Sequence, residues 1–551
     1  TSEISNEENS AQDLLAKVNA QEGNTLPVSA FNEYVDGSTP SGSSAYEKRG
    51  IAVDIPIWQP DNCIQCNRCA YVCPHAVIRP IALTEEEAAN APEGMDMIDM
   101  IGMPNMKFSI AVSAYDCTGC GSCANVCPGK KGEKALVMGN MEANAGRQTF
   151  FDYGTELPIK PEVVAKFKET TVKGSQFKQP LLEFSGACAG CGETPYAKLI
   201  TQLFGDRMYI ANATGCSSIW GNSSPSTPYT VNPQGRGPAW SNSLFEDNAE
   251  FGYGMLLAQN TIRERLKASV EKLAENGVND DVKAAAQEYL DTFSVGATNG
   301  TATDKLVKAL EDCDCGCAER AELLKNKDFL AKKSQWIFGG DGWAYDIGFG
   351  GVDHVLASGQ DINIMVFDTE VYSNTGGQSS KATKTGATAQ FAAGGKETKK
   401  KDLAGIAMSY GYVYVAQIAM GADFNQTVKA IAEAEAYPGP SLIIAYAPCI
   451  NHGIKKGMSK AQTEEQLAVE CGYWNNFRFN PEAEKKFTLD SKEPKGDYQE
   501  FLNGEVRYNA LMRANPEKAQ RLFAQNEAEA MERYEYLKGL VNLYDGTAKE
   551  D

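Results

Sequence analysis

The stretch Asn62-Cys63-Ile64-Gln65-Cys66-Asn67-Arg68-Cys69-Ala70-Tyr71-Val72-Cys73-Pro74 places four cysteines at the spacing C-x-x-C-x-x-C-x-x-x-C-P. The same spacing returns between Cys117 and Pro128. It is the bacterial ligand run for two [4Fe–4S] clusters, in which three close thiolates bind one cluster and the fourth cysteine crosses to the other. The predicted ligand sets are Cys63, Cys66, Cys69 and Cys127 for one cluster, and Cys117, Cys120, Cys123 and Cys73 for the second.

A single run of this kind also fits a structural zinc site, and cysteine-rich chains include disulfide scaffolds. Two tandem copies that both end in Cys-Pro favour iron–sulfur clusters over either alternative. We therefore predict a protein that transfers single electrons. Iron–sulfur clusters need reduced thiolates, and a chain of 551 residues with sixteen cysteines is no small secreted scaffold, so we expect a cytoplasmic location.

Composition and charge narrow the possible classes of protein. The length is typical of roughly two to five domains, and the 42% hydrophobic content supports packed cores. A net charge of −20 argues against a nucleic-acid partner, whose phosphates attract a basic face. Residues 1–25 contain no apolar signal-peptide core, and no apolar run is long enough to predict a membrane span. The basic run at 396–401 is interpreted as a solvated loop, with a docking patch for a redox carrier as the alternative.

The chain divides into five segments by composition and pattern. They are a linker or the end of a preceding domain at 1–50, a ferredoxin-like domain at 51–150, a connector at 151–184, a second domain at 185–475, and a helical tail at 476–551. Insertions are expected at about 83–112 and, helical, at about 255–330.

Strands and helices alternate from about residue 185. Expected strands are 207–212, 335–340, 362–368, 412–418 and 442–447, and expected helices are 193–204, 261–275, 282–293, 343–357, 403–410 and 425–436. Tail helices are expected at 506–512, 516–523 and 527–540. The βαβ pattern predicts a doubly wound parallel sheet. The predicted fold class is α/β: a two-[4Fe–4S] ferredoxin-like domain, followed by a parallel-sheet domain with a helical insertion and a helical C-terminal tail.

A second chemical centre is predicted where two strands end. Gly339-Gly340-Asp341-Gly342 stands between a strand and a helix, at the edge where open α/β sheets bind ligands. Glycines let a phosphate approach the backbone, and a helix N-terminus favours its charge. The next strand ends at 368–371, so Asp341, Thr369 and the carbonyl of Val371 are candidate ligands of Mg²⁺. A simple turn is the alternative for the first motif alone.

Together these motifs resemble the C-terminal half of the pyruvate:ferredoxin (flavodoxin) oxidoreductases, which use thiamine diphosphate. Besides the ferredoxin motifs, the resemblance is carried by three stretches: Gly340-Asp341-Gly342-Trp343-Ala344-Tyr345-Asp346-Ile347-Gly348, Tyr372-Ser373-Asn374-Thr375-Gly376-Gly377-Gln378-Ser379-Ser380 and Pro448-Cys449-Ile450-Asn451-His452-Gly453. It covers about residues 45–551, including the tail around 504–508. It implies that the second domain is a thiamine diphosphate pyrophosphate domain.

The resemblance also implies a third, proximal [4Fe–4S] cluster bound by Cys188, Cys191, Cys216 and Cys449. Without the family, the pair Cys188-x-x-Cys191 equally suits a redox dithiol or half of a zinc site. The residues implied to border thiamine diphosphate and its Mg²⁺ are Glu193, Thr214, Gly215, Cys216, Gly340, Asp341, Gly342, Trp343, Ala344, Thr369, Glu370, Val371, Tyr372, Ser373 and Asn374. Of these, Asn374 and Cys216 are expected at the reacting end of the cofactor.

The implied reaction is the oxidative decarboxylation of pyruvate with coenzyme A to acetyl-CoA and CO₂. Electrons are expected to leave thiamine diphosphate one at a time, through the proximal cluster and the two ferredoxin-type clusters, to an external ferredoxin or flavodoxin. The sequence contains no second α/β domain to bind the aminopyrimidine and no coenzyme A domain. We therefore expect the chain to need an upstream portion or a separate subunit, and the complete enzyme to be a homodimer.

Three other interpretations stay open at this point. The same machinery could act on another 2-oxoacid, the chain could be an electron-transfer subunit with a vestigial thiamine site, or it could be a non-redox thiamine decarboxylase, which the cluster cysteines disfavour. Cys313, Cys315, Cys317 and Cys471 match no ligand spacing and are interpreted as thiols or as a redox-sensitive disulfide. His75 and His354 are expected to be structural, and His452 to be structural or to lie near the proximal cluster.

Overall fold

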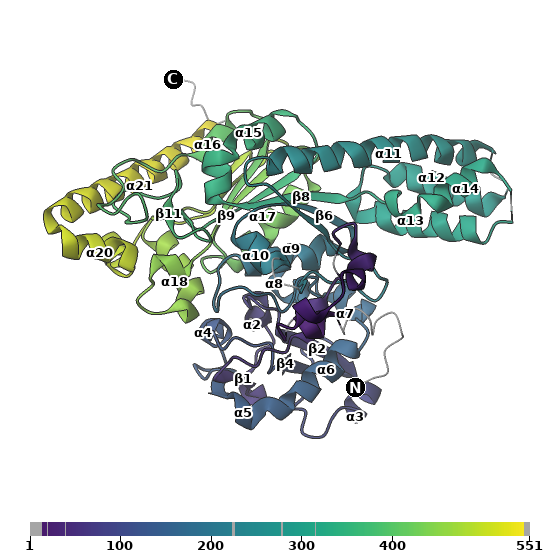
Figure 1. Ribbon diagram of the computed structural model, residues 1–551, viewed down its shortest axis with the longest axis horizontal. Coiled ribbons are helices and arrows are strands. Elements are labelled where there is room, and N and C mark those ends of the chain that lie inside the picture. The colour runs from purple at the N-terminus through teal and green to yellow at the C-terminus, as the bar shows by residue number, and fades with distance from the viewer. Residues whose placement is uncertain are drawn as a thin grey trace.

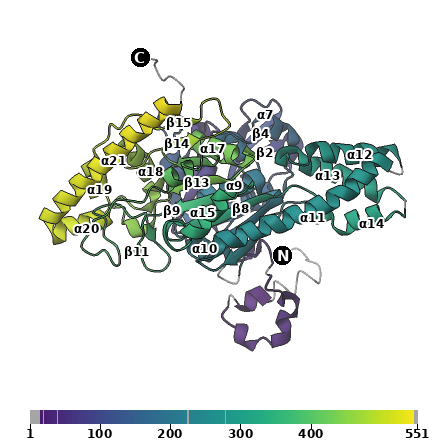
Figure 2. The ribbon, with the colours of Figure 1, turned by 90° about the horizontal axis from the view of Figure 1, so that it is seen from above.

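The computed structural model describes residues 14–18, 20–38, 40–222, 226–276, 279–314 and 316–544. In Figure 1 the ferredoxin-like domain lies below the large sheet of the second domain, while a bundle of helices projects to one side and the C-terminal helix to the other. Figure 2 shows the helical turns of residues 23–34 standing away from the rest of the molecule. Within the described ranges, no helix is both long and apolar enough to cross a membrane.

Two small antiparallel sheets frame the cysteine motifs. One pairs β1 (Asp54–Trp58) with β5 (Leu136–Asn140), and the other has the order β2 (Ile78–Thr84), β4 (Met106–Val112), β3 (Ile98–Asp99). The stretch 83–112 therefore supplies a strand that pairs with β2 along its whole length. It begins with α3 (Glu85–Ala89), which Thr84 and Glu87 cap reciprocally. The motifs themselves lead into the short helices α2 (Arg68–Tyr71) and α4 (Ser122–Val126), which pack together.

One eight-stranded sheet forms the centre of the second domain, in the order β15-β14-β12-β13-β9-β8-β6-β7. Six neighbouring strands run parallel: β6 (Met208–Ala213), β7 (Ala239–Ser243), β8 (Ser334–Gly340), β9 (Asn363–Asp368), β12 (Tyr414–Ile418) and β13 (Ser441–Tyr446). This largely parallel sheet confirms the predicted α/β class.

Both faces of the sheet are buried, which explains why its strands are apolar throughout. In β9, Ile364 and Val366 face one core and Met365 and Phe367 face the other. The first core is covered by α11 (Asn248–Asn276), α15 (Phe349–Ala357) and α16 (Leu403–Met408), and the second by α9 (Thr194–Phe204), α10 (Cys216–Asn222) and α17 (Phe424–Ala436). Tyr71 of the ferredoxin-like domain belongs to the second core, so the two domains share packing.

The helical insertion is formed by α11 together with α12 (Asp280–Thr292), α13 (Gly296–Glu311) and α14 (Ala318–Lys325). It has a separate apolar core, in which Cys313 is buried, and it projects from the sheet in Figure 1. The helices start at residue 248, earlier than expected, because the first turns of α11 pack on β6 and β8. Cys315 lies outside the described residues.

The C-terminal tail is not wholly helical, which corrects the sequence prediction. Residues 477–479 and 487–489 form β14 (Phe477–Phe479) and β15 (Phe487–Leu489), which extend the sheet beyond β12, with β14 antiparallel to it. The remainder forms α19 (Tyr498–Asn503), α20 (Val506–Ala514) and α21 (Pro516–Tyr544). The helices expected at 516–523 and 527–540 are thus one continuous helix. Asn526, which looks like a break, is buried and donates its amide to the Thr385 carbonyl at 2.7 Å.

The helix expected at 343–357 is also interrupted. Gly342–Ile347 is a wide π-helical turn, and a regular helix starts only at Phe349. A side chain at Gly348 would collide with the Trp343 indole, whose Cδ1 lies 2.2 Å from the position of such a Cβ. Turns of this kind are often found at functional sites because they redirect side chains. This one directly follows Asp341.

The remaining helices and strands are short connecting elements. They are η1 (Gly23–Thr25), η2 (Val28–Tyr34), η3 (Ser43–Tyr46), η4 (Pro60–Asn62), α5 (Met141–Asn144), η5 (Ala145–Arg147), α6 (Gln148–Glu156), α7 (Pro161–Lys166), α8 (Val172–Ser175), η6 (Gly205–Arg207), η7 (Lys327–Phe329), β10 (Val371–Tyr372), β11 (Gln378–Ser379), η9 (Ile450–His452), η10 (Met458–Lys460) and α18 (Ala461–Glu470).

A buried carboxyl beneath the sheet predicts a pH dependence of stability. Glu465 is fully buried, accepts hydrogen bonds from Gly421 N (2.7 Å) and Tyr196 Oη (3.1 Å), and has its pKa raised by burial to about 8. The folded state therefore holds a proton that the unfolded state releases above about pH 4.5, so stability should fall as pH rises from 4.5 to 8, by up to about 5 kcal/mol.

This dependence is tested by recording thermal unfolding midpoints between pH 5 and 8 for the wild type and Glu465→Gln. The variant should show a flatter profile, while Glu484→Gln, at an exposed position, should follow the wild type. Parallel profiles for all three proteins would contradict the assignment.

Candidate functional site

The first ferredoxin-type cysteine set surrounds one small cavity. Its walls include Cys63, Cys66 and Cys69 from the first motif and Cys127 from the second. Backbone N–H groups are directed at the sulfurs, since Gln65 N lies 3.4 Å from Cys63 Sγ and Ala135 N lies 3.4 Å from Cys127 Sγ. Such hydrogen bonds stabilise thiolate charge and help to set a cluster's potential.

The second set surrounds another small cavity, lined by Cys117, Cys120 and Cys123 together with Cys73. The fourth cysteine of each motif thus lies with the first three of the other. Burial, and then the neighbouring thiols, raise the pKa of Cys69 and Cys123 well above the usual range. These thiols can ionise only beside positive charge, which cluster iron would provide.

A cubane fits these two sets better than a single zinc ion does. A cubane takes one thiolate on each iron, whereas zinc draws all of its ligands to one point. In each set the four cysteines border a space between them.

The third set gathers from three separate loops. Cys188 and Cys191 precede α9, Cys216 is the first residue of α10, and Cys449 precedes η9. Burial, and then the charge of Glu193, raise the pKa values of Cys191, Cys216 and Cys449. Neighbouring thiols add to this effect, since Cys449 acts on Cys191 and Cys216, and Cys188 acts on Cys449. Glu193 N and Asn451 N lie 3.4 and 3.5 Å from the sulfurs of Cys191 and Cys449. Cys188 is the one exposed member of the set.

A glycine allows two of these loops to meet, and this gives a testable prediction. Gly192 N donates to the Pro448 carbonyl at 3.1 Å, and a Cβ at Gly192 would lie 2.6 Å from Pro448 N. Gly192→Ala should therefore push Cys191 and Cys449 apart, cost about 1–3 kcal/mol of stability by overpacking, and lower the iron content. Iron analysis and electron paramagnetic resonance (EPR) spectra measure the effect.

The matched control is Gly254→Ala, at an exposed helical position with no atom within 4 Å of the added methyl. It should keep all of the iron and gain about 0.5–1 kcal/mol. Full iron and an unchanged EPR spectrum in Gly192→Ala would show that this contact does not position the cysteines.

Next to the third set, a cavity of about 270 Å³ opens at the carboxyl edge of β6, β8 and β9. Of the sequence-predicted residues, it is lined by Glu193, Thr214, Gly215, Cys216, Gly340, Asp341, Gly342, Trp343, Thr369, Val371, Tyr372, Ser373 and Asn374. Ser217, Phe245 and Thr375 also line it and were not predicted. Cys216 thus belongs both to the cysteine set and to the cavity wall, where its Sγ lies 3.1 Å from Ser373 Oγ.

Three oxygen atoms at the floor of this cavity fit a magnesium ion. Thr369 Oγ1 lies 3.0 Å from Asp341 Oδ1 and 3.0 Å from the Val371 carbonyl oxygen. Neighbouring ligands of octahedral Mg²⁺ are about 2.9 Å apart when the Mg–O distance is about 2.0–2.1 Å. The Thr369 hydroxyl has one hydrogen, so it can donate to only one of these two oxygens. A cation between the three atoms would relieve the repulsion between the hydroxyl oxygen and the other acceptor. The donor set of carboxylate, hydroxyl and carbonyl suits a hard cation.

Hydrogen bonds fix the position of the Asp341 carboxyl group at the oxygen site. Its Oδ1 accepts from Thr369 N at 3.2 Å, and its Oδ2 accepts from Ser380 Oγ at 2.6 Å. Burial, and then the charge of Asp368, raise the pKa of Asp341 well above its usual range. A divalent cation would offset this cost by favouring the carboxylate.

Two predicted cofactor residues do not line the cavity. Ala344 is fully buried in the core above the sheet. Glu370 has a φ of +60°, which turns its side chain away to a buried cluster with Lys400 (3.1 Å), Arg507 (2.9 Å) and Tyr473 Oη (2.5 Å). This cluster packs against the loop between β9 and β10 on the side that faces away from the cavity.

His452 also supports this loop. Its Nε2 lies 2.7 Å from the Thr369 carbonyl, and burial lowers its pKa to about 3, so the ring is neutral and Nε2 carries the hydrogen. Its Nδ1 then faces Cys449 N at 3.5 Å. The ring therefore connects the loop of the oxygen site with the loop of Cys449. Of the other histidines, His75 is buried beside the second cysteine set, and His354 is exposed on α15.

The comparisons with known proteins agree with this geometry. A 4Fe-4S dicluster domain matches residues 62–132, the C-terminal TPP-binding domain of thiamine pyrophosphate enzymes matches 321–445, and EKR, a domain of unknown function, matches 4–52. Pyruvate-flavodoxin oxidoreductase from Enterobacter agglomerans is 56% identical over 542 residues, 96% of this chain and 46% of that protein. Pyruvate:ferredoxin oxidoreductase from Moorella thermoacetica is 56% identical over 543 residues, with the same two shares.

Pyruvate-flavodoxin oxidoreductase from Klebsiella pneumoniae is 54% identical over 534 residues, 96% of this chain and 45% of that protein. The fold and these matches define an iron–sulfur protein with a thiamine diphosphate-binding domain. The chain belongs, as the C-terminal half, to the family of pyruvate:ferredoxin (flavodoxin) oxidoreductases, which confirms the resemblance. It spans about half the length of the curated relatives that it matches.

Proposed function

We propose that this chain is the cofactor-binding and electron-transfer part of an enzyme that oxidises pyruvate with coenzyme A. The overall reaction is pyruvate plus coenzyme A plus two oxidised carriers, giving acetyl-CoA, CO₂, two reduced carriers and a proton. The observation that carries the proposal is the double position of Cys216, which lines the cavity of Asp341 and Asn374 and also belongs to the third cysteine set. This supports a third cluster that would contact the binding site of thiamine diphosphate.

The cavity residues have distinct roles in this proposal. Asp341, Thr369 and the Val371 carbonyl would bind Mg²⁺. Gly340 keeps the cavity wall free of a side chain, and Gly342 leaves room for the Tyr372 ring. Bound thiamine diphosphate supplies the carbon nucleophile and the electron sink that decarboxylation requires. Asn374, at the cavity wall, would donate a hydrogen bond near the reacting end of the cofactor. Trp343 and Phe245 give the cavity apolar walls that limit access of water.

The three cysteine sets bind three [4Fe–4S] clusters, and their contacts suggest an order of electron transfer. Gly190 N, between Cys188 and Cys191, donates to the sulfur of Cys120. His75 Nε2 lies 2.9 Å from the Ala187 carbonyl and His75 also borders the cavity of Cys117, Cys120 and Cys123. The second set is therefore the one that contacts the segment of the third set, so an electron path through bound clusters would run from the third set to the second set, and then to the set of Cys63, Cys66, Cys69 and Cys127 and the external carrier.

The partners follow from what the chain contains. The rest of the enzyme would supply the aminopyrimidine and coenzyme A sites, since the relatives are about twice as long as this chain. Ferredoxin or flavodoxin is the external carrier, and the complete enzyme is a homodimer. Because the clusters require reduced thiolates, the cytoplasm is the proposed location.

The test is an anaerobic preparation of the chain together with the other half of the enzyme. Iron analysis should give about twelve atoms per chain, four for each cluster. Pyruvate, with thiamine diphosphate, Mg²⁺ and coenzyme A present, should bleach the cluster absorbance within seconds. If dithionite bleaches the clusters and pyruvate does not, parallel assays with 2-oxoglutarate and 2-oxobutyrate identify a different 2-oxoacid. If none of these 2-oxoacids reduces the clusters, electron transfer would be the only role left for the chain, and the proposed activity would be refuted.

A further inference from the structure

Lys198 is a buried cation that crosses from one domain to the other. It lies on α9, seven residues after Cys191, and its side chain is 2% exposed. Its Nζ donates to the carbonyls of Ala70 and Tyr71, at 3.0 Å for Tyr71. These carbonyls belong to the last turn of α2. The ammonium thus lies beside the backbone between Cys69 and Cys73, one member of each ferredoxin-type cysteine set.

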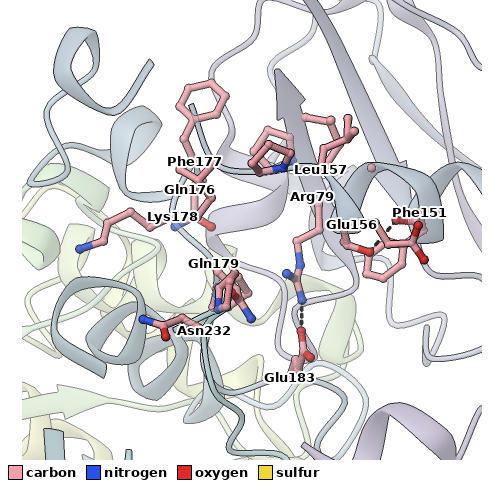
Figure 3. A pocket seen from close by; sticks show the side chains of 18 of the residues that line it. Arg79, Phe151, Glu156, Leu157, Gln176, Phe177, Lys178, Gln179, Glu183 and Asn232 are labelled. Atoms are coloured by element: carbon pink, nitrogen blue, oxygen red, sulfur yellow. Dashed lines mark hydrogen bonds and ion pairs between the residues drawn. The ribbon is translucent and has the colours of Figure 1, made fainter. Parts of the chain in front are cut away.

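No carboxylate compensates this ammonium among the described residues. Its hydrogen-bond partners are the two carbonyls, and the charges that act on it come from Cys73, Arg79 and Cys69. Arg79 is itself neutralised, because its guanidinium forms the ion pair with Glu183 that Figure 3 shows. Both residues line a cavity of about 670 Å³. An ammonium buried without an opposite charge is strongly disfavoured. The charges of Cys69 and Cys73, one from each cysteine set, act on Lys198 in the opposite sense, so their thiolates can offset this cost.

Other lysines near the sets differ from Lys198. The charges of the Cys63 and Cys66 thiols act on Lys173, but this lysine is only half-buried. Lys134 donates a hydrogen bond to the Cys127 carbonyl and is exposed. Water screens charges at such positions. Lys198 alone of the three is enclosed in protein, where a charge acts over a longer distance.

We propose that Lys198 raises the reduction potentials of the two ferredoxin-type clusters. Reduction adds one electron, and therefore one negative charge, to a cluster that is already anionic. A fixed buried cation stabilises the reduced form more than the oxidised form. Lys198 touches neither substrate nor cofactor, so it is a positioning residue that acts through cluster charge. Cys188 and Cys191 directly precede α9, and Lys198 lies on this helix. One helix therefore connects the third cysteine set, which would hold the donor cluster, to the residue that favours reduction of the acceptor clusters.

The inference rests on the proposed clusters, and the experiment separates the two. Holoenzyme carrying Lys198→Met, Lys198→Arg or the control Lys325→Met is titrated anaerobically with dithionite while EPR spectra are recorded. In Lys198→Met, the ratio of reduced to oxidised cluster at a fixed solution potential should fall about tenfold. For a one-electron couple this corresponds to a reduction potential lower by about 59 mV. Lys198→Arg should stay within about twofold of wild type. Lys325, exposed on α14, changes the net charge equally and should leave the ratio unchanged.

Each outcome decides one of the two proposals. A wild-type enzyme without reducible clusters would refute the proposed function itself. If the clusters are reducible and the ratio of reduced to oxidised cluster is the same in wild type and Lys198→Met, the proposed role of Lys198 would be overturned. If Lys198→Met binds no iron, Lys198→Gln replaces it, because glutamine keeps a donor for the carbonyls of Ala70 and Tyr71 and lacks only the charge. An unchanged ratio in that variant would overturn the role equally.

Discussion

Cys216→Ala is expected to lower the iron content from about twelve to about eight atoms per chain and to slow pyruvate-driven cluster reduction more than about a hundredfold. The physical reason is the position of this thiol, which lies at the wall of the cofactor cavity and within the third cysteine set. Without it the electron acceptor nearest to the cavity is lost. The two ferredoxin-type clusters have their own ligands, so dithionite should still reduce them. Stopped-flow absorbance after mixing with pyruvate measures the rate.

Cys471→Ala is the matched control for this variant. It removes a buried thiol that lies at the end of α18 and whose sulfur contacts the Ala468 carbonyl at 3.6 Å. Its iron content and its rate with pyruvate should equal those of wild type. Two results would count against the argument for Cys216: full iron in Cys216→Ala, which would mean that it is no ligand, or fast reduction with eight irons, which would mean that electrons bypass the proximal site.

Local spacing was sufficient to predict much of this architecture. The cysteine motifs are short and regular, so their spacing by itself assigns the cysteines that border each small cavity. The parallel strands were also predictable, because a strand buried on both faces must be apolar along its length, as β9 and β13 are. The Gly-Asp-Gly turn could be placed at the sheet edge from the alternation of strands and helices alone.

Contacts between distant segments were not predictable. β14 and β15 have only three residues each, too few for a period to appear, and they form because the edge of β12 is available. Glu370 was assigned to the cofactor from its neighbours, but a left-handed backbone turns it to Arg507, which is 137 positions later. Lys198 and Ser380 are ordinary residues in their local sequence. Their importance comes from the distant groups that the fold brings to them.

The second large effect is expected at the oxygen site. Asp341→Asn removes the only carboxylate among the three oxygens that fit Mg²⁺, while it keeps the size of the side chain. We expect the affinity for Mg²⁺ with thiamine diphosphate to fall by at least about 10–100-fold, and activity with pyruvate to fall in parallel. Iron content should be unchanged, since the hydrogen bonds of this carboxylate come from Thr369 and Ser380 and not from a cysteine.

The decisive measurement is the thermal midpoint with and without Mg²⁺ and thiamine diphosphate, because a ligand stabilises only the state that binds it. Without ligands, Asp341→Asn should be at least as stable as wild type, since a buried carboxyl with a raised pKa is replaced by a neutral amide. With ligands, the wild type should gain stability and Asp341→Asn should not. Asp346→Asn, in the π-helical turn that follows Asp341 but paired with Lys381 at 2.7 Å, should respond to the ligands as wild type does. An Asp341→Asn variant that is unstable without ligands would assign this carboxyl to the fold and not to the metal, and a normal ligand response would remove it from the site altogether.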